Sequence, residues 1–135
     1  VTGHSMGGHG ALTLAMKLKG RFRSVSAFAP ICNPTQSEWG QKQFSAYLGS
    51  DKSRWTAHDA TLLMAAGGFD GPVLIDTGTD DQFGHLLGTA AMAGAIAEAK
   101  QDAIVRLQKG YDHSYFFIST FMEDHIGFHA EALYS

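Results

Sequence analysis

The sequence predicts an α/β protein in which a parallel β-sheet carries helices on both of its faces. Short apolar runs bounded by Gly or Pro alternate along the chain with segments that have the apolar spacing of helices. This alternation is typical of parallel sheets, because each strand needs a crossover, usually helical, to bring the chain back to the starting edge. The 135 residues, 44% hydrophobic and 17% charged, suffice for one domain with a buried core.

The first expected elements are a strand end, a helix and a buried strand. Residues 1–2 have the character of the last residues of a strand, and a glycine-dense turn follows them. A helix ended by Gly20 comes next, because apolar residues recur there at i, i+3, i+4 and i+7. The run Ser24–Ala29 is stopped by Pro30, as expected of a short buried strand. The apolar stripe of the helix consists of Ala11, Leu14, Ala15 and Leu18.

The rest of the chain continues the alternation without a repeat or a linker. The expected elements are helices at Gln41–Leu48, His58–Ala66 and Thr89–Lys100, strands at Pro72–Thr77 and Ala103–Leu107, and a final helix from Tyr115. One face of the final helix would carry Ile118, Phe121, Met122, His125 and His129. We therefore expect one domain, or part of one.

Composition and charge exclude several classes of function. The formal net charge is −3 and no run of Lys or Arg occurs, so the chain has no electrostatic signature for nucleic acid or a membrane surface. No apolar stretch is long enough to span a membrane. Cys32 is the single cysteine, which rules out an intrachain disulfide and suits a reducing compartment. The chain starts at Val1 rather than Met, so we expect its natural N-terminus to lie upstream.

One motif, at residues 3–7, is typical of catalytic serines. Gly3-His4-Ser5-Met6-Gly7 fits the pattern G-x-S-x-G, between an expected strand end and an expected helix start. In hydrolases with this pattern the serine stands on a sharp, strained turn that presents its hydroxyl above the sheet. We expect Gly3 and Gly7 to be required because side chains there would collide, and Gly8 and Gly10 to let the helix approach the sheet. The pattern predicts Ser5 as a nucleophile.

A serine nucleophile needs a base, which in turn is oriented by an acid. The strand Pro72–Thr77 runs into Asp80 and Asp81, and the strand Ala103–Leu107 runs into His113. Both loops follow the carboxyl ends of their strands, in the order Ser, acid, His that α/β-hydrolases use. Position favours Asp81 over Asp80 only slightly, and Asp76 lies inside the strand.

Other candidate residues have weaker patterns. His4 and His9 flank the serine and either line the site or fill space beside it, while His58 and His85 have no partner pattern. His125 and His129 have a spacing that can bind a metal, but their apolar stripe favours a packed pair. Cys32 is expected to be structural. Trp39 and Trp55 belong either to a cap over the site or to the core.

The extended motifs resemble the S-formylglutathione hydrolases, also called esterase D, over essentially the whole chain. The segments that carry the resemblance are residues 3–12, residues 24–34, Asp80-Asp81-Gln82-Phe83 and Gly110-Tyr111-Asp112-His113-Ser114-Tyr115. The resemblance implies hydrolysis of S-formylglutathione, a small-molecule thioester, to glutathione and formate in formaldehyde detoxification. It implies Ser5 as nucleophile, Asp81 as acid and His113 as base, and so decides between the two aspartates.

The resemblance also carries expectations about the surroundings of the site. It implies a cytoplasmic enzyme that needs no cofactor or metal, that cleaves small carboxyl esters as well, and that forms a homodimer when full length. The backbone N–H of Met6 would be one oxyanion-hole donor. Alternatives are a general carboxylesterase or acyltransferase of the same fold, or a non-catalytic fragment.

Members of that family are about twice as long as this chain. We therefore expect residues 1–135 to be the C-terminal half of an α/β-hydrolase domain that begins at the nucleophile turn. The strands before the turn, the second oxyanion donor and most glutathione contacts would lie in the other half. The 135 residues alone are expected to be inactive.

Overall fold

Four short parallel strands form the sheet in the computed structural model, which describes residues 1–135. Their order across the sheet, β1-β2-β3-β4, is the order along the chain, and the register pairs Phe28 with Asp76 and Asp76 with Arg106. The strands are β1 (Thr2–His4), β2 (Val25–Phe28), β3 (Val73–Gly78) and β4 (Ala103–Gln108). The predicted parallel sheet is confirmed, and each expected strand lies within two residues of its observed bounds.

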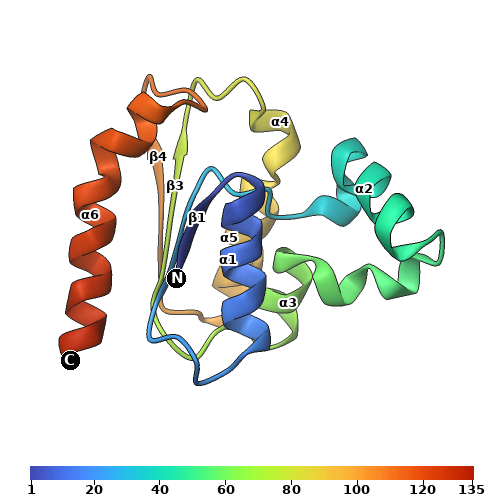
Figure 1. The fold of residues 1–135 in the computed structure, drawn as a ribbon, viewed down its shortest axis with the longest axis horizontal. Helices are drawn as coiled ribbons and strands as arrows, with labels where there is room; N and C mark the ends of the chain where they lie inside the picture. Colours follow the sequence, from blue (N-terminus) through green and yellow to red (C-terminus); the bar gives the residue numbers. More distant parts are fainter.

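Helices cover both faces of the sheet, as predicted. In Figure 1, α6 stands alone on one side of the strands, while α1, α3 and α5 lie on the other. The helices are α1 (Met6–Lys17), α2 (Glu38–Leu48), α3 (Ala60–Ala66), α4 (Gly84–Leu87), α5 (Thr89–Ala99) and α6 (Tyr115–Tyr134), with 3₁₀ turns at Pro34–Gln36, Lys52–Arg54 and Thr56–His58. The short α4 was not expected, because four residues are too few to show a helical period.

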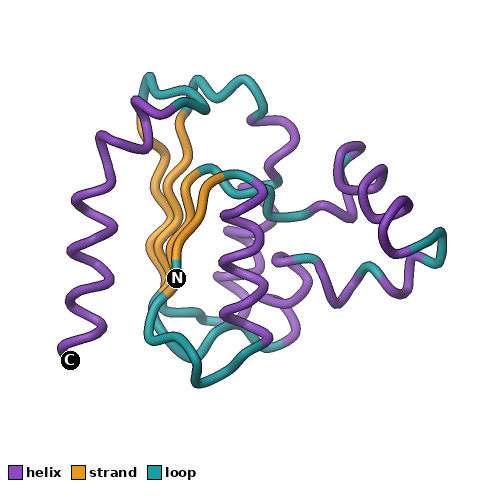
Figure 2. Tube along the Cα trace, viewed as in Figure 1, coloured by secondary structure: helices purple, strands orange, loops and turns teal.

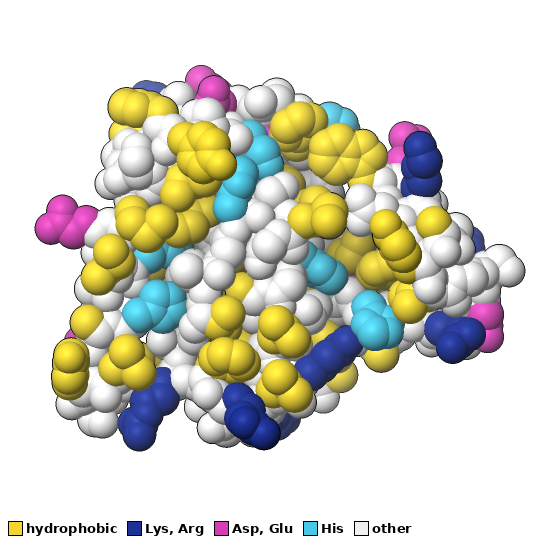
Figure 3. All heavy atoms as spheres, in the orientation of Figure 1, with side chains coloured by type: hydrophobic (Ala, Val, Ile, Leu, Met, Phe, Trp, Pro, Cys, Tyr) yellow, Lys and Arg dark blue, Asp and Glu magenta, His cyan; other side chains and the backbone are white.

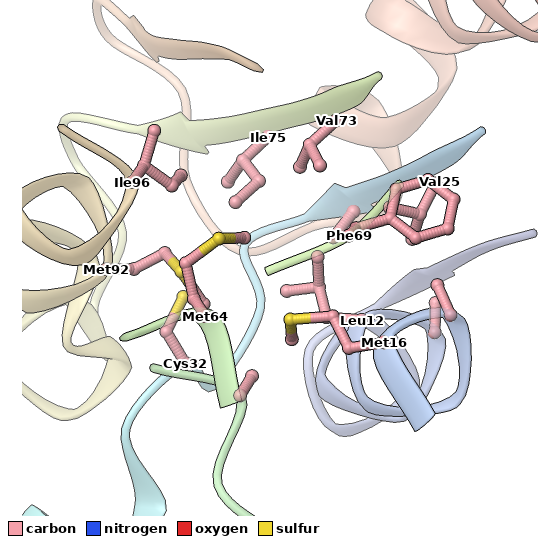
Figure 4. Close-up of a cluster of buried hydrophobic side chains, with 14 of the residues drawn as sticks. Leu12, Met16, Val25, Cys32, Met64, Phe69, Val73, Ile75, Met92 and Ile96 are labelled. Atoms are coloured by element: carbon pink, nitrogen blue, oxygen red, sulfur yellow. The ribbon is translucent and has the colours of Figure 1, made fainter. Parts of the chain in front are cut away.

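The main core lies between the sheet and the helices α1, α3 and α5. Alternate residues of the central strands point into it, and Figure 4 shows them meeting side chains from the helices. The labelled members include Leu12, Met16, Val25, Met64, Val73, Ile75 and Met92. The opposite residues of β2 and β3, which include Ser26, Phe28 and Asp76, face α6. A smaller apolar cluster with Phe28 and Phe117 forms there.

The buried face of α1 differs from the predicted stripe. Ala11 and Ala15 are buried as expected, but Leu14 and Leu18 are 47% and 46% exposed. Gly8, Leu12 and Met16 are buried instead. The reason is that α1 packs against Pro30 through Gly8, which turns the Leu12 side of the helix toward β2. The helix itself was predicted correctly, and its buried face was not.

The segment with α2 projects from the layers, as the tube in Figure 2 shows. Ser37 caps α2 by accepting a hydrogen bond from the Gly40 N–H, and Asp59 caps α3 through the N–H groups of Thr61 and Leu62. On the face in Figure 3, Lys and Arg side chains are scattered among apolar ones and form no continuous basic patch. None of the helices combines the length and the apolar character that crossing a bilayer requires.

Candidate active site

Ser5 stands on the sharp turn between β1 and α1. Its backbone has φ 56° and ψ −117°, a conformation that is strained for a residue with a side chain. The neighbouring backbone holds this turn: the Ser5 N–H donates to the Phe28 carbonyl at 2.9 Å, and the Ser5 carbonyl accepts from the N–H groups of His9 and Ile31. The turn therefore has the strained geometry that the G-x-S-x-G pattern predicts.

Only some of the glycines around Ser5 are required by space. A Cβ at Gly3 would collide with the backbone carbonyl of Gly7, and one at Gly8 would press on Pro30. A Cβ at Gly7 or Gly10 would meet nothing within 4 Å. The expectations that a side chain at Gly7 would collide and that Gly10 allows the helix to approach the sheet are therefore wrong, since both positions face open space.

We expect Gly3→Ala to destabilise the protein by about 3 kcal/mol, because the added methyl collides with backbone rather than with a movable side chain. Gly10→Ala is the matched control and should be neutral or stabilising by up to about 1 kcal/mol, since alanine favours a helix interior. Urea unfolding of both variants measures the difference. Equal stability of the two variants would contradict the geometry of the turn.

Asp81 and His113 form a short, shielded hydrogen bond on the loops after β3 and β4. Asp81 Oδ2 lies 2.7 Å from His113 Nδ1, and the two side chains are 0% and 10% exposed. The other carboxylate oxygen accepts the Phe83 N–H at 2.8 Å. Asp80 is exposed, and its carboxylate accepts a hydrogen bond only from the Thr79 hydroxyl. Of the two adjacent aspartates, the structure pairs Asp81 with the histidine.

Aromatic rings hold the His113 imidazole from two sides. The His4 ring lies 4.5 Å away between centroids, and the Phe83 ring meets His113 edge-on at 5.1 Å. Burial lowers the pKa of His4, and the nearby His113 lowers it further. Of the two roles that the sequence left open for His4, the structure shows that it lines the cleft beside Ser5. Phe83 was missed, although it ends the Asp80-Asp81-Gln82-Phe83 motif.

A cleft of about 590 Å³ opens beside Ser5. Its walls come from the nucleophile turn and from α2, which brings Trp39 and Lys42 to the site. The complete lining is His4, Ser5, Met6, Ile31, Trp39, Lys42, Gln43, Ala46 and Tyr47. A larger groove of about 770 Å³ runs along β4 and α5. It contains neither Ser5 nor His113, so the smaller cleft is the candidate site.

The three residues expected to form a catalytic triad follow the carboxyl ends of β1, β3 and β4, which lie at one edge of the parallel sheet. The ring of His4, the chain neighbour of Ser5, lies against the ring of His113, whose Nδ1 is bonded to Asp81. The Ser5 hydroxyl lines the cleft and makes no hydrogen bond to the protein. Such bonds are often long before substrate binds. Met6 begins α1, so its N–H has no partner within the helix and is free to bind an anion.

The other sequence candidates lie away from this chemistry. His9 accepts a hydrogen bond from the Ala60 N–H at the start of α3, so it has a structural role. His58 contacts Lys17. Cys32 is fully buried, and burial raises the pKa of its thiol. Trp55 belongs to the interior, whereas Trp39 lines the cleft. No group of three or more His, Cys, Asp and Glu side chains is placed to hold a metal ion.

The chain is similar to known esterases over almost its whole length. The family described as "Putative esterase" matches residues 1–128. The chain belongs to this esterase family. It is 60% identical over 133 residues to the S-formylglutathione hydrolase of Paracoccus denitrificans and 56% identical over 137 residues to that of Mus musculus. In each case the match covers 98% of this chain and 48% of the relative.

A solved structure shows the same architecture. The S-formylglutathione hydrolase from Agrobacterium tumefaciens superimposes with a TM-score of 0.93 at 44% identity, over 98% of this chain and 48% of that one. The α/β fold inferred from the sequence is thereby confirmed. The chain spans about half the length of the curated relatives it matches.

Proposed function

We propose that the whole protein hydrolyses S-formylglutathione to glutathione and formate. The observation that carries the proposal is the Asp81–His113 hydrogen bond of 2.7 Å beside Ser5, which stands on a strained turn at the mouth of a cleft. A shielded carboxylate that orients an imidazole next to a serine is the arrangement for nucleophilic acyl transfer. Similarity to three S-formylglutathione hydrolases supports the choice of thioester.

The proposed reaction has two acyl-transfer steps. His113 Nε2 takes the proton of Ser5 as Oγ attacks the thioester carbonyl, while Asp81 stabilises the imidazolium through Nδ1. The Met6 N–H stabilises the oxyanion, together with a second donor from outside these 135 residues. The C–S bond then breaks, and the glutathione sulfur leaves with the proton from His113. Water, deprotonated by His113, attacks the formyl ester, and formate leaves as Ser5 regains its proton.

The cleft offers one charged group to the leaving thiol. Lys42 on α2 is the only Lys, Arg, Asp or Glu among its lining residues. Glutathione carries two carboxylates and one amine, so a cationic side chain in the cleft favours it over a neutral leaving group. Trp39 and Tyr47 add apolar area on the same wall. This composition supports an anionic peptide thiol rather than a simple alcohol as the leaving group.

The test compares kcat/KM for S-formylglutathione and for a neutral aryl ester in the whole protein and in Lys42→Ala. We expect the variant to raise KM for the thioester about twofold to fivefold, an effect of the size of one exposed charged contact. The aryl ester should be cleaved with kcat/KM unchanged. Lys52→Ala, on the 3₁₀ turn beyond α2, is the control. Preference for the aryl ester in the parent protein would instead indicate a general carboxylesterase.

The same resemblance supports a cytoplasmic location, independence of any cofactor, and a homodimer as the working form of the whole protein. Static light scattering of the purified whole protein tests the dimer. A single species at the monomer mass would exclude it.

A further inference from the structure

A buried polar network lies between the sheet and α6, on the face opposite the main core. At its centre is Asp76 of β3, whose side chain is 0% exposed. The guanidinium of Arg106 donates to both carboxylate oxygens, at 2.7 and 2.6 Å, and Gln108 donates a third bond at 3.0 Å. Burial raises the pKa of Asp76, but the hydrogen bonds from His125, Arg106 and Gln108 outweigh it and lower the pKa to about 2.

His125 connects this carboxylate to the next strand. Its Nε2 lies 2.8 Å from Asp76 Oδ2, and its Nδ1 lies 2.8 Å from Ser26 Oγ on β2. The imidazole is 1% exposed and stacks on Phe28, with 3.7 Å between the ring centroids. One turn later, His129 contacts Ser26 Oγ at 2.9 Å. The histidine pair that the sequence placed on the α6 face is thus bound to sheet hydroxyls.

The arrangement of Ser26, His125 and Asp76 resembles a catalytic triad, but a substrate has no access to it. Ser26 and Asp76 are fully buried, and neither lines the cleft that contains Ser5. A charged network in such a place adds little stability over apolar packing, because desolvation offsets most of the attraction. Directional hydrogen bonds instead select a single position of α6 on the sheet, where apolar contacts alone would allow several.

The elements joined by this network are those that hold the Asp81–His113 pair. β3 carries Asp76 and continues into the loop with Asp81, and β4 continues from Arg106 into the loop with His113. α6 begins two residues after His113. A shift or rotation of α6 on the sheet would therefore move His113 directly. Arg106 also donates to Asp124 of α6 at 3.0 Å, on the exposed side of the network. The other side-chain contacts of α6 with the sheet include an apolar cluster centred on Phe117.

We propose that His125, held between Ser26 and Asp76, is a positioning residue that sets α6 on the sheet and so places His113 for catalysis. This proposal rests on the proposed function, in which His113 is the base. Small displacements of a base are costly, since about 1 Å of misplacement can reduce a rate about a hundredfold. The network contributes no residue to the lining of the cleft beside Ser5. Loss of the network should therefore lower kcat while leaving substrate binding in that cleft intact.

The test replaces His125 in the whole protein. His125→Phe keeps a ring to stack on Phe28 and removes both nitrogens, and we expect kcat to fall about tenfold to a hundredfold with KM changed less than about threefold. His125→Gln keeps an N–H that reaches Asp76 and should recover part of the loss. In proton NMR, the downfield signal of the His113 Nδ1 proton should shift or broaden in His125→Phe.

Met122→Ala is the matched control, because Met122 lies one turn earlier on α6 and packs in the apolar cluster without joining the network. It should lower Tm by a similar amount but keep kcat and the downfield signal. Equal losses of kcat in Met122→Ala and His125→Phe would show a merely structural role and overturn the proposal. If His125→Phe does not fold, Ser26→Ala and His125→Gln decide by the same readouts.

The activity of Ser5→Ala distinguishes failure of the positioning role from failure of the proposed function. If Ser5→Ala is inactive and the His125 and Ser26 variants all keep full kcat, only the positioning role fails. If Ser5→Ala keeps its activity, the proposed function fails and the positioning role fails with it.

Discussion

Replacement of Ser5 by alanine is expected to lower kcat of the whole protein by about a million-fold, the loss found when a triad serine is removed. The variant removes the only group proposed to attack the carbonyl carbon. Alanine accepts the same left-handed backbone at no greater strain than serine, so the fold should persist. Steady-state hydrolysis and circular dichroism measure the two effects. Ser53→Ala, on an exposed turn, is the control and should retain full activity.

Substitution of His113, the proposed base, tests whether it acts together with Ser5. His113→Ala should cost about as much as Ser5→Ala, and the double variant no more than either one, because the two groups act as a unit. Losses that multiply in the double variant would show that Ser5 and His113 act independently, which contradicts a shared proton transfer.

Asp81→Asn is expected to lower kcat by about ten thousand-fold while the protein remains folded. An amide in this place can donate to Nδ1, which puts the imidazole proton on Nε2 and prevents it from accepting the Ser5 proton. Because Asp81 is fully shielded and lies 2.7 Å from His113, no water can take over its role. Steady-state hydrolysis measures the loss of kcat, and circular dichroism measures whether the fold persists.

Asp80→Asn is the matched control one residue away. Its carboxylate is exposed and bonds only to Thr79, so kcat should stay within about threefold of the parent. A larger loss in Asp80→Asn than in Asp81→Asn would contradict the assignment of the acid.

The fold, and the edge of the sheet at which the candidate site lies, could be predicted because their signals are local. Short apolar runs bounded by Gly or Pro gave the strands, and loops after parallel strands share one edge of the sheet. That rule alone brings Ser5, Asp81 and His113 together. It does not distinguish Asp80 from Asp81, since adjacent side chains differ only in direction. The choice depends on the turn in which the Phe83 N–H bonds Asp81.

Other features depend on packing between distant segments and had no local signal. The side of α1 that is buried depends on how Gly8 meets Pro30, and apolar spacing alone suggested Leu14 and Leu18. His125 meets Ser26 across 99 residues of sequence, so its i, i+4 spacing with His129 said nothing of its partners. Lys42 reaches the cleft only because α2 projects over it. The spacing of apolar residues along a helix identifies its apolar face, but it does not identify the segment against which that face packs.

The most direct test of the central claim is to label the whole protein with a fluorophosphonate and map the adduct by mass spectrometry. The account predicts one adduct per chain, located on Ser5, formed rapidly in the parent and at least about a hundredfold more slowly in Asp81→Asn and His113→Ala. An adduct on any other residue, or labelling of Ser5 at the same rate in all three proteins, would contradict a nucleophile activated by His113 and Asp81.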